Sequence, residues 1–588
     1  MDYAAKCKPN RRAATAGRGQ FTSQPGEPGW RPAEFALQLF VDAPEPHKTP
    51  AVAPAPCPRL TPAVQTEPQP APSARPPLRL WPAGLILALL AATLAVIRSL
   101  GHLPYQSRNL ASMVAVLLGL ALLWLWWLLL SRAAWHWRLG VCGGAALVVA
   151  LAVGLFRIRG VSGDLIPILE PRWARPVAPP APAGSPPSTN SAPAPATARR
   201  PDFPQFLGPD RNCVIPGVAL DPDWAARPPQ VLWRQPIGAA WSGFAIVGNQ
   251  AVTQEQEGEN ETVTCYELLT GRRLWRHADA AHYKTTLAGE GPRCTPTIVS
   301  NRVFSLGATG ILNCLDLTDG RRLWTRQITT DAGSTVPEWG FAGSPLVVGG
   351  RVIVSAGGRD GRSLLAYHAD TGEIVWSGGS RPANYSSPVL LTLAAAPQIV
   401  MFNSRQINAH DPHTGLVLWE YPWGTGHPQV AVPVPVGSNR VVFSSGYGVG
   451  AELLEIVPDT HDRLSARRVW KSIRLKAKFA NFIARDGFLY GLDDGVLVCV
   501  AVNDGSLRWK EGRYGHGQML LIGDLLLVTA ENGELVLLRP TPEAPNELHR
   551  WRVFTGKTWN PPALAGDILL VRNDQEAACL RLPLAPGP

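Results

Sequence analysis

Four basic side chains in the C-terminal part of the chain could together bind an anion: Arg293, Lys478, His516 and Lys557. Each lies at or beside the same position of a repeating unit, shortly before an apolar run. Guanidinium and ammonium groups recognise carboxylates, and a concave site needs only a few such groups. Core packing alone would favour small apolar residues at these positions. The pattern therefore predicts a site for an anionic ligand such as a carboxylate or an acidic peptide. The alternative is that these basic side chains are simply exposed to solvent and bind nothing.

A tryptophan repeat sets the positions of these residues. Five copies follow a Thr-Gly or Asp-Gly turn, as in Asp319-Gly320 before Trp324, and three copies are degenerate. Successive tryptophans are 42, 49, 52, 43, 51, 39 and 42 residues apart. A period of this length is typical of one blade of a β-propeller, which holds four antiparallel strands. The eight tryptophans are Trp233, Trp275, Trp324, Trp376, Trp419, Trp470, Trp509 and Trp551.

The repeat that ends at Trp324 shows why a blade should have four strands. Short apolar and β-branched runs alternate with turns that contain asparagine or glycine, and we see no room for a helix between them. The four predicted strands are residues 295–302, 303–307, 311–316 and 322–324.

The two ends of the repeat region predict a closed ring. Only three strands follow Trp551, whereas residues 230–234 form a lone strand ahead of the first complete repeat. The early strand would complete the last blade, which closes the ring and removes its exposed sheet edges. We therefore predict an all-β eight-bladed propeller with four-stranded blades over residues 205–588.

The tryptophans, with four of the nine cysteines, are predicted to build this ring. Each indole can pack on the neighbouring blade and donate its N–H to a backbone carbonyl. Cys265, Cys314 and Cys499 lie ten residues before a repeat tryptophan, and Cys579 matches the same position. Free cysteine provides the small apolar side chain that fits there. Because the sequence has no CxxC and no adjacent cysteine pair, we expect no metal site.

Three uncharged apolar spans within residues 78–160 precede the repeats: 80–97, 110–130 and 139–156. Each is near the ~20 residues that a helix needs to cross a bilayer, and arginines flank each one. A buried helical hairpin of a soluble domain is the alternative, but no polar partner face is available to it. We predict three transmembrane helices. Arginines near the membrane are equally numerous on both sides, which leaves the orientation open.

Two segments rich in proline and alanine flank this region. Residues 1–77 have no early apolar run and no sustained period, so we predict a disordered tail without a signal peptide. Residues 171–204 are predicted to be a stiff linker. The first 200 residues carry a net charge of +12 and the remainder −2. Because the positive charge lies outside the predicted folded domain, nucleic acid is not an expected partner.

Blade register extends the candidate site to a ring of residues around one mouth of the propeller, with Ala342, Val430 and Trp241 at further equivalent positions. No catalytic residue is predicted. The predicted ligand-binding residues at the funnel mouth are Arg293, Glu338, Trp339, Tyr385, Lys478, Asn481, His516, Lys557, Trp559 and Asn560.

The clearest repeats, residues 367–376 and 409–419, resemble the tryptophan-docking motif Ala-x-Asp-x-x-Thr-Gly-x-x-x-Trp of the quinoprotein, or PQQ-like, propeller superfamily. The segments 202–211 and 340–345 are similar to those of PQQ-binding-like repeat proteins common in planctomycetes. The resemblance covers about residues 202–584 and recurs in phase. It implies either a dehydrogenase that holds PQQ and calcium, or a non-catalytic propeller such as the lipoprotein of the outer-membrane β-barrel assembly machinery.

Two departures from the quinoprotein alcohol dehydrogenases weigh against the enzyme. Those enzymes typically have a vicinal disulfide over the cofactor, and they carry long insertions between blades, for which 39 to 52 residues per repeat leave little room. Their calcium-binding residues also cannot be matched one by one. A membrane-bound glucose dehydrogenase does place transmembrane helices before its propeller, which keeps the alternative open. On that alternative, PQQ and calcium would be the cofactors.

We therefore predict a membrane-anchored, non-catalytic binding or protein-interaction scaffold of the bacterial cell envelope. It would lie in the inner membrane with its propeller on the periplasmic side, and bind another envelope protein, a peptide or a small anionic ligand. A PQQ- and calcium-dependent dehydrogenase of alcohols or sugars is the alternative. A sensor that signals across the bilayer is a third hypothesis, for which the tail offers no recognisable output domain.

Overall fold

The computed structural model describes residues 77–100, 103, 105–173, 200–459 and 463–586. The predicted disordered tail lies outside these residues except for Pro77. Most of the predicted linker, residues 174–199, lies outside them as well.

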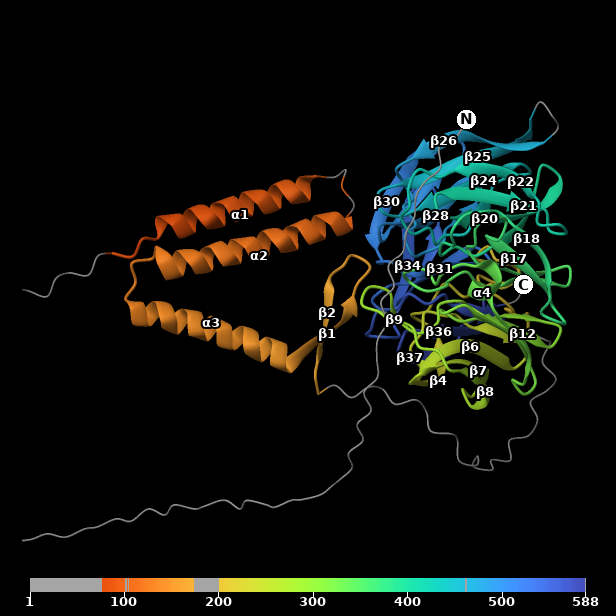
Figure 1. The fold of residues 1–588 in the computed structure, drawn as a ribbon, viewed down its shortest axis with the longest axis horizontal. Coiled ribbons are helices and arrows are strands. Elements are labelled where there is room, and N and C mark those ends of the chain that lie inside the picture. The colour runs from red at the N-terminus through yellow and green to blue at the C-terminus, as the bar shows by residue number, and fades with distance from the viewer. Residues whose placement is uncertain (1–76, 101–102, 104, 174–199, 460–462, 587–588) are drawn as a thin grey trace, which may run out of the picture. The chain divides into compact units, whose positions relative to one another are not determined.

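Eight antiparallel sheets form the propeller that the repeat predicts (Figure 1). The first four are β5–β8 (Ala245–Val247, Gln250–Glu257, Asn260–Glu267, Arg273–Asp279), β11–β14 (Thr297–Val299, Arg302–Leu306, Ile311–Asp316, Arg322–Gln327), β15–β18 (Leu346–Val348, Arg351–Ser355, Leu364–His368, Ile374–Gly378) and β19–β22 (Val389–Leu393, Ala396–Asn403, Gln406–His410, Val417–Pro422).

The second half of the ring repeats this order. The blades are β23–β26 (Val434–Pro435, Arg440–Ser445, Gly450–Pro458, Leu464–Ser472), β27–β30 (Ile483–Arg485, Phe488–Asp493, Val496–Ala501, Leu507–Arg513), β31–β34 (Gln518–Ile522, Leu525–Thr529, Glu534–Pro540, Pro545–Arg552) and β35–β37 (Ala563–Ala565, Ile568–Arg572, Glu576–Arg581), which is completed by β4 (Gln230–Pro236).

The ring closes in the way that the two ends of the repeat region predict. β4 pairs antiparallel with β37, and Trp233 lies opposite Cys579. The fully buried Arg572 guanidinium spans this junction, donating to the carbonyls of Gly238 (2.7 Å) and Gln254 (3.0 Å) in the next blade. An N-terminal strand therefore completes the C-terminal blade, which has four strands like the other blades.

The repeat tryptophans join neighbouring blades, as expected. Six of them donate the indole N–H to a backbone carbonyl of the following blade, over 2.7–3.2 Å. Trp419 instead donates to the Gln398 side chain (2.6 Å), because the following blade replaces the tight Thr-Gly turn with two nine-residue strands. The half-buried Trp551 has no such turn beside it, because the two outer strands of the following blade, β37 and β4, come from opposite ends of the repeat region. The six bonds run from Trp233 to Leu268, Trp275 to Leu317, Trp324 to Ala369, Trp376 to Pro412, Trp470 to Val502 and Trp509 to Thr541.

The glycine of each Thr-Gly or Asp-Gly turn has a second function that the sequence did not indicate. Gly320 has φ +74°, which favours glycine, and a Cβ atom there would lie 2.4 Å from Cε3 of Trp275. The missing side chain thus makes space for the indole of the preceding blade. The same close approach recurs at Gly271, Gly372, Gly415 and Gly505.

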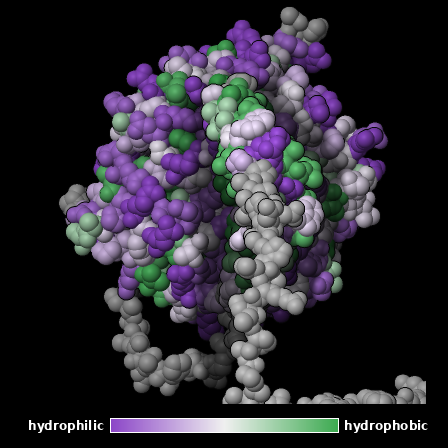
Figure 2. Space-filling view, turned by 90° about the vertical axis from the view of Figure 1, so that its left-hand side faces the viewer, coloured by the Kyte–Doolittle hydropathy of each residue, from purple (hydrophilic) through white to green (hydrophobic). Residues whose placement is uncertain are grey.

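Three helices precede the ring: α1 (Trp81–Ser99), α2 (Tyr105–Leu129) and α3 (Trp135–Leu155). All three are long and apolar enough to cross a membrane, and most of their large side chains are uncovered, Leu117 and Val148 being 66% exposed. The face in Figure 2 shows a band of hydrophobic residues among mainly hydrophilic ones. α2 begins five residues before the predicted apolar span, because its first turns are polar but still helical.

Several short elements were missed in the sequence. Helix α4 (Ile328–Ala332) directly follows β14, in the connection to the next blade, and was not predicted, whereas no helix interrupts the four strands β11–β14. A two-stranded insertion, β9 (Lys284–Thr285) and β10 (Gly289–Glu290), follows β8, and β3 (Val214–Ile215) pairs in parallel with β31. The strands β1 (Phe156–Val161) and β2 (Pro167–Pro171) form a hairpin directly after α3.

The contact between glycine and indole can be tested with a matched pair of variants. Gly350 has φ +70° but no atom within 4 Å of the position that an added Cβ would take, so Gly350→Ala adds only backbone strain, about 1–2 kcal/mol. Gly320→Ala should add about 1–3 kcal/mol more, because the methyl group must displace Trp275. Urea unfolding of the two variants measures the difference. Equal losses of stability would contradict a role for the glycine in indole docking.

Candidate functional site

A cavity of about 210 Å³ lies at the mouth of the propeller funnel. Most of its wall comes from the loops that lead into the innermost strand of each blade. Arg293 precedes β11, Tyr385 precedes β19, Lys478 precedes β27 and Trp559 precedes β35. Because the ring fixes all blades in the same phase, equivalent residues converge here from distant parts of the sequence.

Six of the ten predicted site residues line this cavity, together with three residues at the further equivalent positions, Trp241, Ala342 and Val430. The six are Arg293, Trp339, Tyr385, Lys478, Asn481 and Trp559.

The other four predicted residues lie elsewhere. His516 and Lys557 lie beside the cavity and contact the β1–β2 hairpin. Glu338 is exposed, and its carbonyl accepts a hydrogen bond from the Tyr283 hydroxyl. The buried amide of Asn560 donates to the carbonyls of Ala240 (3.0 Å) and Ser242 (2.7 Å), so its side chain fastens the last blade to the first.

Aromatic rings make up much of the wall. Trp339 stacks on Tyr385 with a centroid separation of 5.2 Å, and Phe479 contacts Trp559 at 4.9 Å. Trp241 lies 5.0 Å from Trp559. Rings in this arrangement offer flat apolar surface to a ligand. The indole N–H groups of Trp241 and Trp559 donate within the protein, to the Ala288 carbonyl and to Glu531.

Basic groups lie among these rings and are removed from water. Burial lowers the pKa of Lys478 and of Lys557 to about 8, although nearby carboxylates oppose this, and it lowers the pKa of Arg293 to about 10. The Lys557 ammonium lies 4.0 Å from the ring centroid of Trp559, and the Arg293 guanidinium lies 4.6 Å from that of Tyr283. Cations held in such surroundings would interact strongly with an anion that enters the cavity.

Several wall residues were not found in the sequence, among them Phe206, Leu287, Ala288, Gln518 and Pro561. Tyr447 and Phe479 line the cavity, and Lys478 lies within 5.1 Å of both ring centroids. Phe479 directly follows Lys478, so its position could have indicated it. Gln106 of α2 and residues Val161, Ser162, Gly163 and Leu165 of the β1–β2 hairpin also contribute, and no repeat connects them to the blades.

The acidic and metal-ligating side chains of the described residues do not form a cation site. No group of three or more His, Cys, Asp or Glu side chains among them is placed to hold a metal ion. The cysteines that are described are free, and those of the propeller are buried. Burial raises the pKa of the Cys265 and Cys579 thiols to about 12, as expected of cysteines that pack beside the repeat tryptophans.

The repeats match a known family. The model of the family described as outer membrane protein assembly factor BamB matches residues 259–511. The matched residues are thus similar to repeats of the PQQ type. They confirm the resemblance that the tryptophan-docking motif indicated. A comparison with curated proteins found no match.

Several solved structures are similar to part of this chain. BamB from Moraxella catarrhalis is 14% identical, with 60% of this chain and 100% of that chain covered and a TM-score of 0.45. The quinohemoprotein alcohol dehydrogenase from Comamonas testosteroni is 14% identical, with coverage of 66% and 82% and a TM-score of 0.46. Sqt1 from Saccharomyces cerevisiae is 11% identical, with coverage of 60% and 98% and a TM-score of 0.45. Similarity at this level gives no information on function.

The buried lysines should titrate in an unusual range. We expect Lys478 and Lys557 to lose their protons near pH 8, whereas an exposed lysine does so near pH ~10.4. Competitive labelling with acetic anhydride at a series of pH values, read by mass spectrometry of the peptides, measures both midpoints. Midpoints above pH ~10 would show that the two ammonium groups are solvated, contrary to the structure.

Proposed function

We propose that this protein is a membrane-anchored, non-catalytic binding protein of the cell envelope, whose PQQ-type propeller holds an anionic ligand in the funnel mouth. The observation that carries the proposal is the cavity itself, in which Arg293 and Lys478 lie within a mainly aromatic wall. Both side chains donate to backbone carbonyls, Arg293 to Ala288 and Gly289 and Lys478 to Gly163, and their positive charges would attract an anion that enters the cavity. The ligand would therefore combine a carboxylate or similar anion with a flat apolar portion.

Membrane anchoring is supported by the three apolar helices ahead of the ring. With three crossings, the N-terminal tail and the propeller would lie on opposite sides of the membrane. We place the protein in the bacterial inner membrane with the propeller on the periplasmic side. In that position its partner would be a small anionic ligand, a peptide or another envelope protein.

The dehydrogenase alternative requires a cofactor site that the described residues do not fit. A hard cation such as calcium needs six to eight oxygen ligands, usually including several carboxylates. No cluster of three or more metal-ligating side chains is present in the described part of the chain. The basic, aromatic cavity could still accept PQQ as an anionic aromatic ligand, so PQQ is a useful probe of the site.

The ligand proposal predicts a preference for charge at constant shape. The full-length protein in detergent should bind 2-naphthoate more tightly than its neutral analogue 2-naphthamide. Arg293→Met should weaken naphthoate about tenfold, because it removes one charged hydrogen-bond donor from the cavity. Arg272→Met is the control, since its guanidinium is exposed and pairs with Glu267 outside the cavity. Isothermal titration calorimetry measures the four affinities.

Three outcomes would change the proposal. Equal affinity for naphthoate and naphthamide would contradict an anion site. Loss of binding in Arg272→Met as large as in Arg293→Met would place the site elsewhere. Tight stoichiometric binding of PQQ with calcium, together with dye-coupled oxidation of an alcohol or sugar, would favour the dehydrogenase.

A further inference from the structure

The loop of the β1–β2 hairpin enters the funnel mouth and forms part of the cavity wall. Its residues Val161, Ser162, Gly163 and Leu165 line the cavity. Gly163 and Asp164 are buried, although they lie in a tight loop between two largely exposed strands. A loop of this composition is normally solvated, so its burial needs specific partners in the ring.

Asp164 has two positively polarised partners in the ring. Its Oδ1 lies 3.2 Å from Nε2 of His516, and its Oδ2 lies 3.4 Å from the Arg513 guanidinium. Burial acts to raise the pKa of Asp164, but the hydrogen bond to His516 and the charges of Arg513 and Lys478 outweigh it and keep the pKa below its ordinary value. The negative charge of the Asp164 carboxylate is therefore stabilised by its hydrogen bond to His516 and by the nearby positive charges.

The backbone of Gly163 is bound at both of its polar atoms. Its N–H donates to Oε1 of Glu531 (2.7 Å), and its carbonyl accepts from the Lys478 ammonium (2.5 Å). The same Glu531 oxygen accepts from the Trp559 indole (3.0 Å), and the other accepts from the His516 backbone (3.0 Å). Glu531 is thus held in place by the ring itself, in position to receive a backbone N–H group.

Only glycine fits at residue 163. A Cβ atom would lie 2.0 Å from Cδ2 and 2.7 Å from Cγ of His516, a side chain that is itself buried. At Gly160, three residues earlier in the same hairpin, the nearest atom to an added Cβ would be Nζ of Lys557, at 3.8 Å. The close approach is therefore a property of residue 163 and not of the hairpin as a whole.

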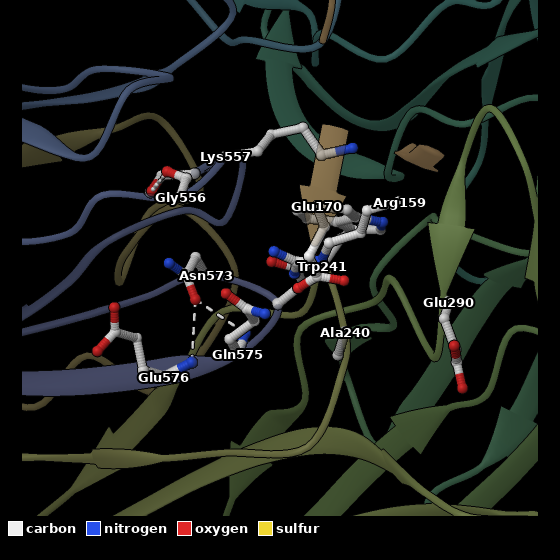
Figure 3. A network of polar contacts seen from close by, with 12 residues as sticks. Arg159, Glu170, Ala240, Trp241, Glu290, Gly556, Lys557, Asn573, Gln575 and Glu576 are labelled. Atoms are coloured by element: carbon white, nitrogen blue, oxygen red, sulfur yellow. Dashed lines mark hydrogen bonds and ion pairs between the residues drawn. The ribbon is translucent and has the colours of Figure 1, made fainter. Parts of the chain in front are cut away.

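A second contact lies along the side of the hairpin. The Lys557 ammonium donates to the Val161 carbonyl (3.1 Å), and Arg159 forms an ion pair with Asp574 (2.5 Å). Asp574 belongs to a turn in which Oδ1 of Asn573 accepts from the backbone of Gln575 and Glu576 (Figure 3). The ring residues at this contact flank the strands of the last blade, whereas those that bind the loop come from the two blades before it: Lys478 lies before β27, Arg513 ends β30, His516 lies before β31 and Glu531 lies between β32 and β33.

We propose that Lys478, Arg513, His516 and Glu531, the rim cluster, form a recognition site for an acidic Gly-Asp turn, and that the chain's own hairpin occupies this site as a closing strap over the funnel cavity. The cluster offers donors to a carboxylate and to a carbonyl, and an acceptor to the intervening N–H. A Gly-Asp turn presents these three groups together. The inference deepens the proposed function, because the strap would control access of the ligand to the cavity.

The strap can be tested in the ligand-free, full-length protein by hydrogen–deuterium exchange. In Gly163→Ala the methyl group cannot fit beside His516, so exchange at residues 156–171 and at the rim segments 476–480 and 514–518 should become about tenfold faster. Gly160→Ala should exchange like the native chain, because the added methyl has space. Asp164→Asn should accelerate exchange in the same segments, and its control Glu170→Gln, which loses only the pair with Arg157 within the hairpin, should not.

Each result decides the proposal. Equal exchange in Gly163→Ala and Gly160→Ala, or fast exchange of the hairpin loop in the native chain, would overturn it. Circular dichroism and thermal unfolding show whether the ring remains folded in each variant. Because the experiment uses no ligand, the strap can fail while the binding of naphthoate holds, and the converse result is equally distinguishable.

Discussion

The packing of an indole from one blade over the turn glycine of the next is the contact on which the rest of the structure depends. It buries a large aromatic side chain, satisfies its N–H with a backbone carbonyl, and leaves no space for any side chain at the turn. Since the contact recurs at most blade boundaries, it fixes the blades in one phase. The pairing of β4 with β37 then closes the ring without such a turn.

The candidate site is a direct consequence of this phase. Each blade contributes the loop before its innermost strand to one mouth, so residues as distant as Arg293 and Trp559 lie in the same cavity wall. The ring can hold basic groups there in partly dry surroundings, at a cost that is reflected in the lowered pKa values of the two lysines. Groups perturbed in this way, within a cleft, are typical of binding sites. The β1–β2 hairpin then adds the Asp164 carboxylate and the Gly163 carbonyl at the rim, next to the positive charges of Arg513 and Lys478.

The fold could be predicted from the sequence best where the same structural unit, one blade, repeats. The period of the tryptophans predicted the number of blades, the order of strands and, in six of the eight blades, the small residue opposite the indole, such as Cys314 opposite Trp324. Counting in register also found seven residues of the cavity wall: Trp241, Arg293, Ala342, Tyr385, Val430, Lys478 and Trp559. Neighbours of these positions were predicted less well, since Trp339 and Asn481 line the cavity but Glu338 and Asn560 do not. The position of a backbone in the register does not give the direction of the side chains beside it.

The hairpin could not be predicted in the same way. Gly163 and Asp164 form an ordinary turn in the sequence, and their partners lie more than 300 residues later. Their role depends on the shape of the assembled rim, which no local pattern encodes. The same applies to the five turn glycines that lie beneath an indole, because the sequence shows their turn but not the indole, which belongs to another blade.

The most direct test of this account is a cryo-electron microscopy structure of the full-length protein in lipid nanodiscs. The account predicts α1, α2 and α3 within the bilayer and the hairpin loop in the funnel mouth, with Asp164 between Arg513 and His516. A map in which the three helices lie outside the bilayer, or in which the hairpin loop lies away from an open funnel, would contradict it.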